Sequence, residues 1–146
     1  MQVFRLQWPE LDASVRVKAA EENPHVFDWF CTNLPTKSLQ THTVVAGYCL
    51  TSMSVPVRNP FPWTLDSLYQ EDLVVLRPGR ALLNMTIGNV VNLGFKWAGM
   101  TENMKYAVWS EVVPEDLPTL RKVGATVWAN MMSAEKRLIH VEFVAA

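Results

Sequence analysis

The stretch LVVLRPGRALLNMTIG, residues 73–88, constrains the fold of this 146-residue chain more than any other feature. Two apolar runs flank a tight RPGR, in which proline presets φ and glycine supplies a permissive turn position. The pattern predicts a strand at Leu73–Leu76, a turn, and a second strand over Ala81–Ile87 that ends at Gly88. Asn84 interrupts the second run, so it either finds a hydrogen-bond partner within the fold or faces a pocket. The first interpretation is preferred because buried polar groups are nearly always satisfied.

Period-two alternation predicts further strands on both sides of this hairpin. In residues 14–19, SVRVKA, small apolar side chains alternate with Arg16 and Lys18. Residues 41–57, THTVVAGYCLTSMSVPV, are rich in β-branched and aromatic types and indicate two strands broken near Ala46 and Gly47. Other strands are predicted at residues 3–8, 106–113 and 137–146, whereas the Gly- and Asn-punctuated residues 89–106 are predicted to form a long, partly ordered loop.

Two helices are predicted, one early and one late. Asn23 is a suitable N-cap and Pro24 suits the first helical position. Apolar residues follow at helical spacing: Val26, Phe27, Phe30, Cys31 and Leu34. The late helix opens with Pro114, Glu115 and Asp116, and its apolar stripe is Leu117, Leu120, Val123, Gly124 and Val127. Glycine costs about 1 kcal/mol against alanine in a helix, so close packing is expected at Gly124.

This order of elements predicts a mainly β fold. Runs of strands with two helices kept apart favour an antiparallel sheet closed into a barrel, with a helix at each end. A chain of 146 residues corresponds to one ordinary domain, so a single domain over residues 1–146 is expected.

Composition excludes several classes of partner. The 13 basic and 14 acidic residues give a net charge of -1 without a basic cluster, so neither nucleic acid nor an anionic membrane is an expected partner. No run approaches the roughly 20 apolar residues of a membrane span, and no secretory leader is recognised. Cys31 and Cys49 fit a reducing cytoplasm as small core residues. The three histidines lack metal-ligand spacing, so no metal and no cofactor are expected.

The ordered set of motifs resembles proteins of cyclophilin-like fold. AAEENPHVFDWFCTNLP (19–35) is similar to the first cyclophilin helix. GYCLTSMSVPV (47–57), RNPFPW (58–63), the stretch 73–88 and VVPEDLPTLRKVG (112–124) then follow in the order seen in small, uncharacterised bacterial proteins of this fold. The resemblance implies a closed antiparallel β-barrel with two helices.

The resemblance does not extend to the catalytic motif of prolyl isomerases. Those enzymes carry a Phe-His-Arg strand whose arginine is catalytic, whereas this chain has THTVVAGYC, with His42 but no adjacent arginine. Their glutamine-containing, glycine-rich segment is also missing. A shared fold does not carry function with it, so isomerase activity ranks last among the functions considered.

The candidate catalytic residues are His42 and Glu102. His42 is either a general base or a hydrogen-bonded histidine at the barrel rim. Glu102 lies among aromatic residues and is either an acid or base of raised pKa or a solvated loop residue. Flat rings and a few polar groups are common pocket walls, so the predicted substrate-binding residues are Tyr48, Arg58, Trp63, Trp97, Tyr106 and Trp109.

Further candidates each have a simple alternative. Cys49 is either a nucleophile or a core residue. Three arginines near the proline loops either grip a substrate carboxylate or are solvated: Arg58, Arg77 and Arg80. Four methionines fit either a homo-oligomer interface or core filling: Met100, Met104, Met131 and Met132.

We therefore expect a small-molecule enzyme that acts on a polar, carboxylate- or amide-bearing metabolite by acid–base chemistry. The alternative is a non-catalytic accessory subunit that binds a ligand or a protein at the same surface. A residual prolyl isomerase ranks third.

Overall fold

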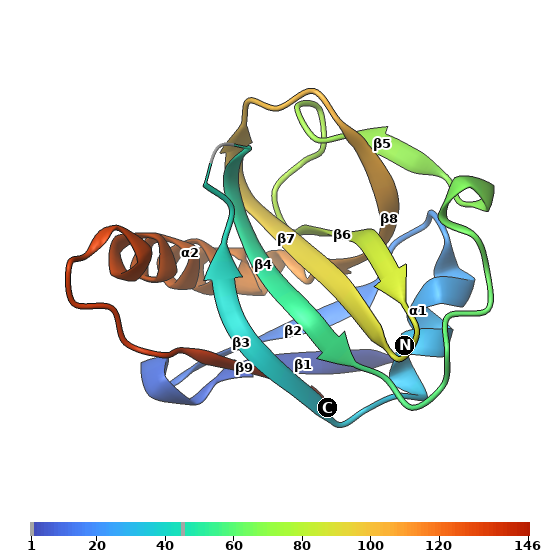
Figure 1. Ribbon diagram of the computed structural model, residues 1–146, viewed down its shortest axis with the longest axis horizontal. Coiled ribbons are helices and arrows are strands. Elements are labelled where there is room, and N and C mark those ends of the chain that lie inside the picture. The colour runs from blue at the N-terminus through green and yellow to red at the C-terminus, as the bar shows by residue number, and fades with distance from the viewer. Residues whose placement is uncertain (1, 45) are drawn as a thin grey trace.

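The computed structural model describes residues 2–44 and 46–146, and over these residues eight antiparallel strands close into a barrel (Figure 1). The described residues form nine strands, of which all but β5 belong to the ring: β1 (Val3–Trp8), β2 (Ala13–Ala19), β3 (Thr36–His42), β4 (Gly47–Pro56), β5 (Gln70–Asp72), β6 (Arg80–Ile87), β7 (Val90–Met100), β8 (Lys105–Val112) and β9 (His140–Ala145). Their order is β2-β1-β9-β3-β4-β7-β6-β8, and pairing of β8 with β2 closes the ring. The short β5 pairs with residues 105–107 of β8, beyond the stretch that meets β2. The predicted closed antiparallel barrel is confirmed.

Two α-helices flank the barrel on opposite sides, α1 (Pro24–Cys31) at the right and α2 (Leu117–Met132) at the left of Figure 1. Three short 3₁₀ helices complete the described elements: η1 (Pro9–Leu11), η2 (Leu65–Ser67) and η3 (Pro114–Asp116). No helix in the described part of the chain has the length and apolar character needed to cross a bilayer.

The interior of the barrel is packed with aromatic side chains. The Phe4 ring lies 5.3 Å from that of Phe30 and 6.1 Å from that of Trp109, between centroids. Phe27 on α1 and Phe143 on β9 complete this cluster. On β9, Val141 and Phe143 are buried and alternate with the partly exposed His140 and Glu142, so the C-terminal strand forms part of the core.

The close packing expected at Gly124 is confirmed. A Cβ atom at this position of α2 would overlap the indole ring of Trp97 on β7. The predicted apolar stripe of this helix is also buried, with Leu120, Val123 and Val127 in the core. The glycine therefore lets α2 approach the barrel closely.

The predicted strand at Leu73–Leu76 is wrong, because this segment is a turn. The main-chain N–H groups of Val75 and Leu76 both donate to the Asp72 carbonyl, at 3.2 and 3.1 Å. The Asp72 side chain accepts from the N–H of Val74 at 3.0 Å, which starts the turn. Leu73 and Leu76 are buried and the two valines are exposed, a spacing of three that fits no strand. The RPGR turn and the strand after it are confirmed.

The predicted loop at residues 89–106 is also wrong. Residues Val90–Met100 form β7, which pairs with both β4 and β6. The glycine and asparagine residues that indicated a loop have local roles within the sheet. A Cβ at Gly94 would lie 3.0 Å from the Cys49 sulfur, and the Asn92 side chain accepts from the N–H of Ser54 at 2.8 Å.

Candidate ligand-binding cavity

A cavity of about 290 Å³ lies on the outer face of strands β4, β7, β6 and β8. Successive strand residues point to opposite faces, so residues that flank the lining positions, such as Leu50 and Leu83, point into the barrel core. The strand residues that line the cavity are Cys49, Thr51, Leu82, Asn84, Gly94, Met100 and Tyr106. The connecting segments add Thr43, Val44, Ala46, Leu73, Glu102 and Met104. These segments, β3–β4, β5–β6 and β7–β8, gather at the top of Figure 1.

Two oxygen atoms in the lining are buried without a hydrogen bond. Asn84 Oδ1 and Thr51 Oγ1 have no partner among the residues that the structure describes. The register between β6 and β7 shifts between Leu83 and Met85, which leaves Asn84 as the extra residue of a bulge, and bulges re-aim side chains. Asn84 therefore faces the cavity, contrary to the preferred expectation of a partner within the fold.

Glu102 and Tyr106 add ionisable groups to the same cavity. Burial raises the pKa of the Tyr106 hydroxyl, and the nearby negative charge of Glu102 raises this pKa further. Burial raises the pKa of the Cys49 thiol to about 12, although Lys96 opposes the shift. A thiol with such a pKa stays protonated near neutral pH, which favours the core interpretation of Cys49 over the nucleophile.

His42 lies outside the cavity lining, in an aromatic cluster with Tyr48, Trp97 and Trp128. The Trp97 indole N–H donates to His42 Nε2 at 2.9 Å. Since Nε2 accepts, the proton sits on Nδ1, which donates to the Thr43 carbonyl at 2.7 Å. Only 5% of the residue is exposed, and burial lowers the pKa of His42. Both ring nitrogens are engaged, so the geometry favours the hydrogen-bonded histidine over the general base.

The other predicted binding residues do not line this cavity. Trp109 belongs to the barrel core, and Trp63 packs edge-on against His25 at 4.7 Å between ring centroids. Arg58 donates to the carbonyls of Leu34 and Pro35, at 3.4 and 3.2 Å. Among the eight predicted site residues, only Glu102 and Tyr106 share the cavity, because strand register decides which side chains meet.

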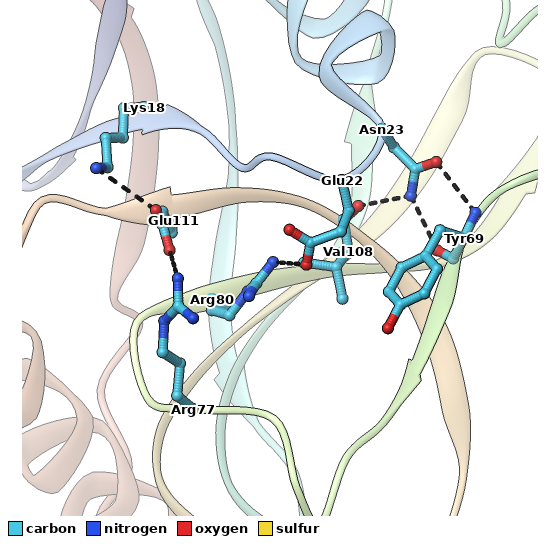
Figure 2. Close-up of polar contacts among 8 residues, drawn as sticks. All are labelled: Lys18, Glu22, Asn23, Tyr69, Arg77, Arg80, Val108 and Glu111. Atoms are coloured by element: carbon cyan, nitrogen blue, oxygen red, sulfur yellow. Dashed lines mark hydrogen bonds and ion pairs between the residues drawn. The ribbon is translucent and has the colours of Figure 1, made fainter.

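Two of the three arginines considered for a substrate carboxylate are paired with carboxylates of this chain (Figure 2). Arg77 donates to Glu111 at 2.9 Å, and the nearly buried Arg80 donates to Glu22. Among the described residues, no lining residue of the cavity carries a positive charge. The cavity thus offers oxygen acceptors and a carboxylate, but no cation for a carboxylate ligand.

Figure 2 also shows the contacts of Asn23 with Tyr69, just before β5, and with Val108 on β8. The Asn23 amide donates to the carbonyls of Tyr69 and Val108, at 2.9 and 2.7 Å, and accepts from the Tyr69 N–H at 3.1 Å. Asn23 therefore ties the start of α1 to Tyr69, the residue before β5, and to β8, rather than capping the helix with its side chain.

A metal site has no support in the described part of the chain. No group of three or more His, Cys, Asp or Glu side chains there is close enough to hold an ion.

Comparison with known proteins finds a likeness among solved structures. No family model and no curated protein matches the chain. The structure of McbB in complex with tryptophan superposes with a TM-score of 0.79 at 25% sequence identity, over 97% of this chain and 44% of that one. This chain therefore spans less than half the length of McbB, and the likeness concerns the barrel.

Proposed function

We propose that this chain binds a small metabolite in the cavity on the outer face of the barrel, and that Glu102 exchanges a proton with it. The observation that carries the proposal is that two residues of the cavity lining, Asn84 and Thr51, each hold a buried oxygen that has no hydrogen-bond partner among the described residues. Buried acceptors are rarely left unpaired, and ligand N–H or O–H groups would satisfy both.

The lining indicates the chemistry of the ligand. Two acceptor oxygens and the Glu102 carboxylate suit an ammonium or amide group, whereas a carboxylate would find no cation there. Apolar side chains such as Leu73, Leu82 and Met100 suit an apolar ring or chain. We therefore favour an amine- or amide-bearing ligand over a carboxylate-bearing one. Tryptophan, the molecule bound to McbB, combines an ammonium group and an apolar ring with a carboxylate, so only its first two groups match this lining.

In the proposed chemistry, Glu102 acts as proton acceptor for the ligand nitrogen. The Tyr106 hydroxyl, whose pKa is raised, remains protonated at neutral pH and serves as a hydrogen-bond donor beside it. The order of motifs further supports membership of the cyclophilin-like superfamily, which we propose alongside this function. A homo-oligomer and a cytoplasmic location stay predictions.

A non-catalytic accessory subunit is the second candidate. Exposed apolar side chains surround the cavity, including Val44, Val74, Val75 and Met104. Such a rim suits contact with a partner protein. A chain of this kind would bind the same ligands without turning them over.

The test uses two matched indole ligands, tryptamine, which carries an ammonium group, and indole-3-propionate, which carries a carboxylate. We expect titration calorimetry to detect binding of tryptamine but not of indole-3-propionate. Replacing Glu102 by Gln removes a charged hydrogen-bond acceptor and should weaken tryptamine binding by about tenfold or more.

The control is Glu135→Gln, which changes an exposed carboxylate far along the chain and should leave the affinity unchanged. Binding of neither ligand, or preference for indole-3-propionate, would contradict the proposed ligand class.

A further inference from the structure

Lys96 is a buried cation that does not line the cavity but holds one of its walls. Only 3% of the residue is exposed, and no carboxylate pairs with it among the described residues. Its Nζ donates to the main-chain carbonyl of Leu73 at 2.8 Å, to that of Leu76, and at the limit of 3.5 Å to that of Val74. We call residues 73–76 the strap.

The hydrogen bonds of the strap explain why an ammonium group is needed. Its N–H groups are satisfied, with Leu73 donating to the Met104 carbonyl at 2.8 Å and the next three residues donating to Asp72. Three strap carbonyls then converge on Lys96. An ammonium has three N–H donors and no acceptor, so it matches this set of carbonyls in number and kind.

The strap also forms part of the proposed binding site. Leu73 lines the cavity, and Leu76 is buried beside Cys49 and Leu82 in the outer apolar cluster. On the other side of Lys96, its directly opposed partner on β4 is Cys49, which also lines the cavity. The lysine therefore stands between the strands that form the cavity floor and the strap that forms a wall.

We infer that Lys96 is a positioning residue, whose ammonium group fixes the strap and thereby sets the affinity of the cavity without touching the ligand. The inference about ligand affinity rests on the proposed function, whereas the inference about the strap does not. A methionine would fill the same space among apolar neighbours at no desolvation cost. The charged group at this position is therefore explained by the hydrogen bonds that it donates to the strap carbonyls. Burial lowers the pKa of Lys96, although the nearby Glu71 carboxylate opposes this shift.

The first experiment uses the ligand-free chain and compares Lys96→Met with wild type by amide hydrogen exchange. The strap amides of Leu73, Val75 and Leu76 should exchange about tenfold faster or more in the variant, since three carbonyls lose their donors. The core amides of Val141 and Phe143 on β9 should be unchanged. Lys96→Arg retains N–H donors and should restore most of the protection, and Lys37→Met, at an exposed lysine, should have no effect.

Unchanged exchange in the strap, or equal acceleration in the strap and in β9, would overturn the inference. The wild-type chain provides a second measurement that holds even where Lys96→Met fails to fold. The Lys96 ammonium protons should exchange slowly, and its nitrogen should show hydrogen-bond scalar couplings to the carbonyl carbons of Leu73 and Leu76. Ammonium exchange as fast as that of Lys37, without such couplings, would overturn the inference.

Ligand affinity separates this inference from the proposed function. Tryptamine should bind Lys96→Met about tenfold more weakly than wild type, since the ligand must then order the strap, and Lys96→Arg should recover most of the loss. Faster strap exchange together with equal tryptamine affinity in wild type and Lys96→Met would overturn the role in affinity. Absence of tryptamine binding to wild type, with the exchange result intact, would remove the proposed ligand and leave the role of Lys96 in fixing the strap.

Discussion

The two faces of strands β4, β6, β7 and β8 differ in nearly every respect. The inner face is closed, apolar and aromatic, and its side chains pack around Phe4 and Trp109. The outer face carries a cavity, with two residues in its lining that hold unpartnered oxygens, and a buried lysine. Because successive residues of a strand point to opposite sides, adjacent positions serve these two different surfaces.

From this difference we expect stability and the proposed ligand binding to be separable in this chain, although both depend on the same strands. Substitutions on the inner face should lower the free energy of unfolding. Substitutions of cavity oxygens on the outer face should change ligand affinity with little effect on that free energy. The predictions below test this separation, beginning with the largest expected effect.

Trp109 tests the inner face. It is fully buried, and its ring contacts Phe4, Phe27 and Phe30. Replacing it by alanine should lower the free energy of unfolding by about 3–5 kcal/mol, because a large cavity opens in the core. Trp109→Phe should cost much less, since the indole N–H has no partner among the described residues and its loss removes an unsatisfied donor. Urea denaturation measures both, and a loss below about 1 kcal/mol for Trp109→Ala would contradict the assignment of this core.

The dependence of stability on pH tests the role of His42, which is buried where the barrel meets α2. Its pKa is lowered from 6.5 by burial, so below this pH the unfolded chain takes up a proton at His42 before the folded chain does. Stability should therefore fall as the pH drops through 6.5 and below. His42→Gln retains a donor and an acceptor but does not titrate, so it should show a smaller fall in denaturant midpoint between about pH 7.5 and about pH 5. Identical pH profiles for the two proteins would contradict the role of buried, neutral His42.

Thr51 tests the outer face, where the expected effect on stability is smallest. Its hydroxyl has no partner, so Thr51→Val should change the free energy of unfolding by no more than about 0.5 kcal/mol, or raise it. The same variant should bind tryptamine more weakly. Thr41→Val is the matched control, because the Thr41 hydroxyl donates to the Thr51 carbonyl at 2.7 Å and its loss should cost about 1 kcal/mol. Equal losses of stability in the two variants would show that the two hydroxyls do not differ as described.

Much of the fold could be predicted from the sequence because alternation and helical spacing are local signals. The inward residues of β9, the stripe of α2 and the close approach at Gly124 follow from residue type and spacing alone. The two wrong assignments arose where a long-range contact decides the structure. Residues 73–76 have strand composition, but the Asp72 side chain and Lys96 hold them in a turn.

The candidate site could be predicted only in part, because it depends on strand register. Glu102 and Tyr106 are close in sequence and do share the cavity. Thr51 and Gly94 were missed as cavity residues, although they are directly opposed across β4 and β7. No local sequence pattern around either residue indicates this pairing, and a loop at residues 89–106 would not allow it.

The most direct test of the central claim is to locate bound tryptamine by nuclear Overhauser contacts on the isotope-labelled chain. The proposal predicts contacts from the indole protons to the methyl groups of Leu73 and Leu82, together with shifts of the Asn84 side-chain amide. Contacts to Trp97 and Trp128 in the His42 cluster, or to no residue of the outer face, would contradict it.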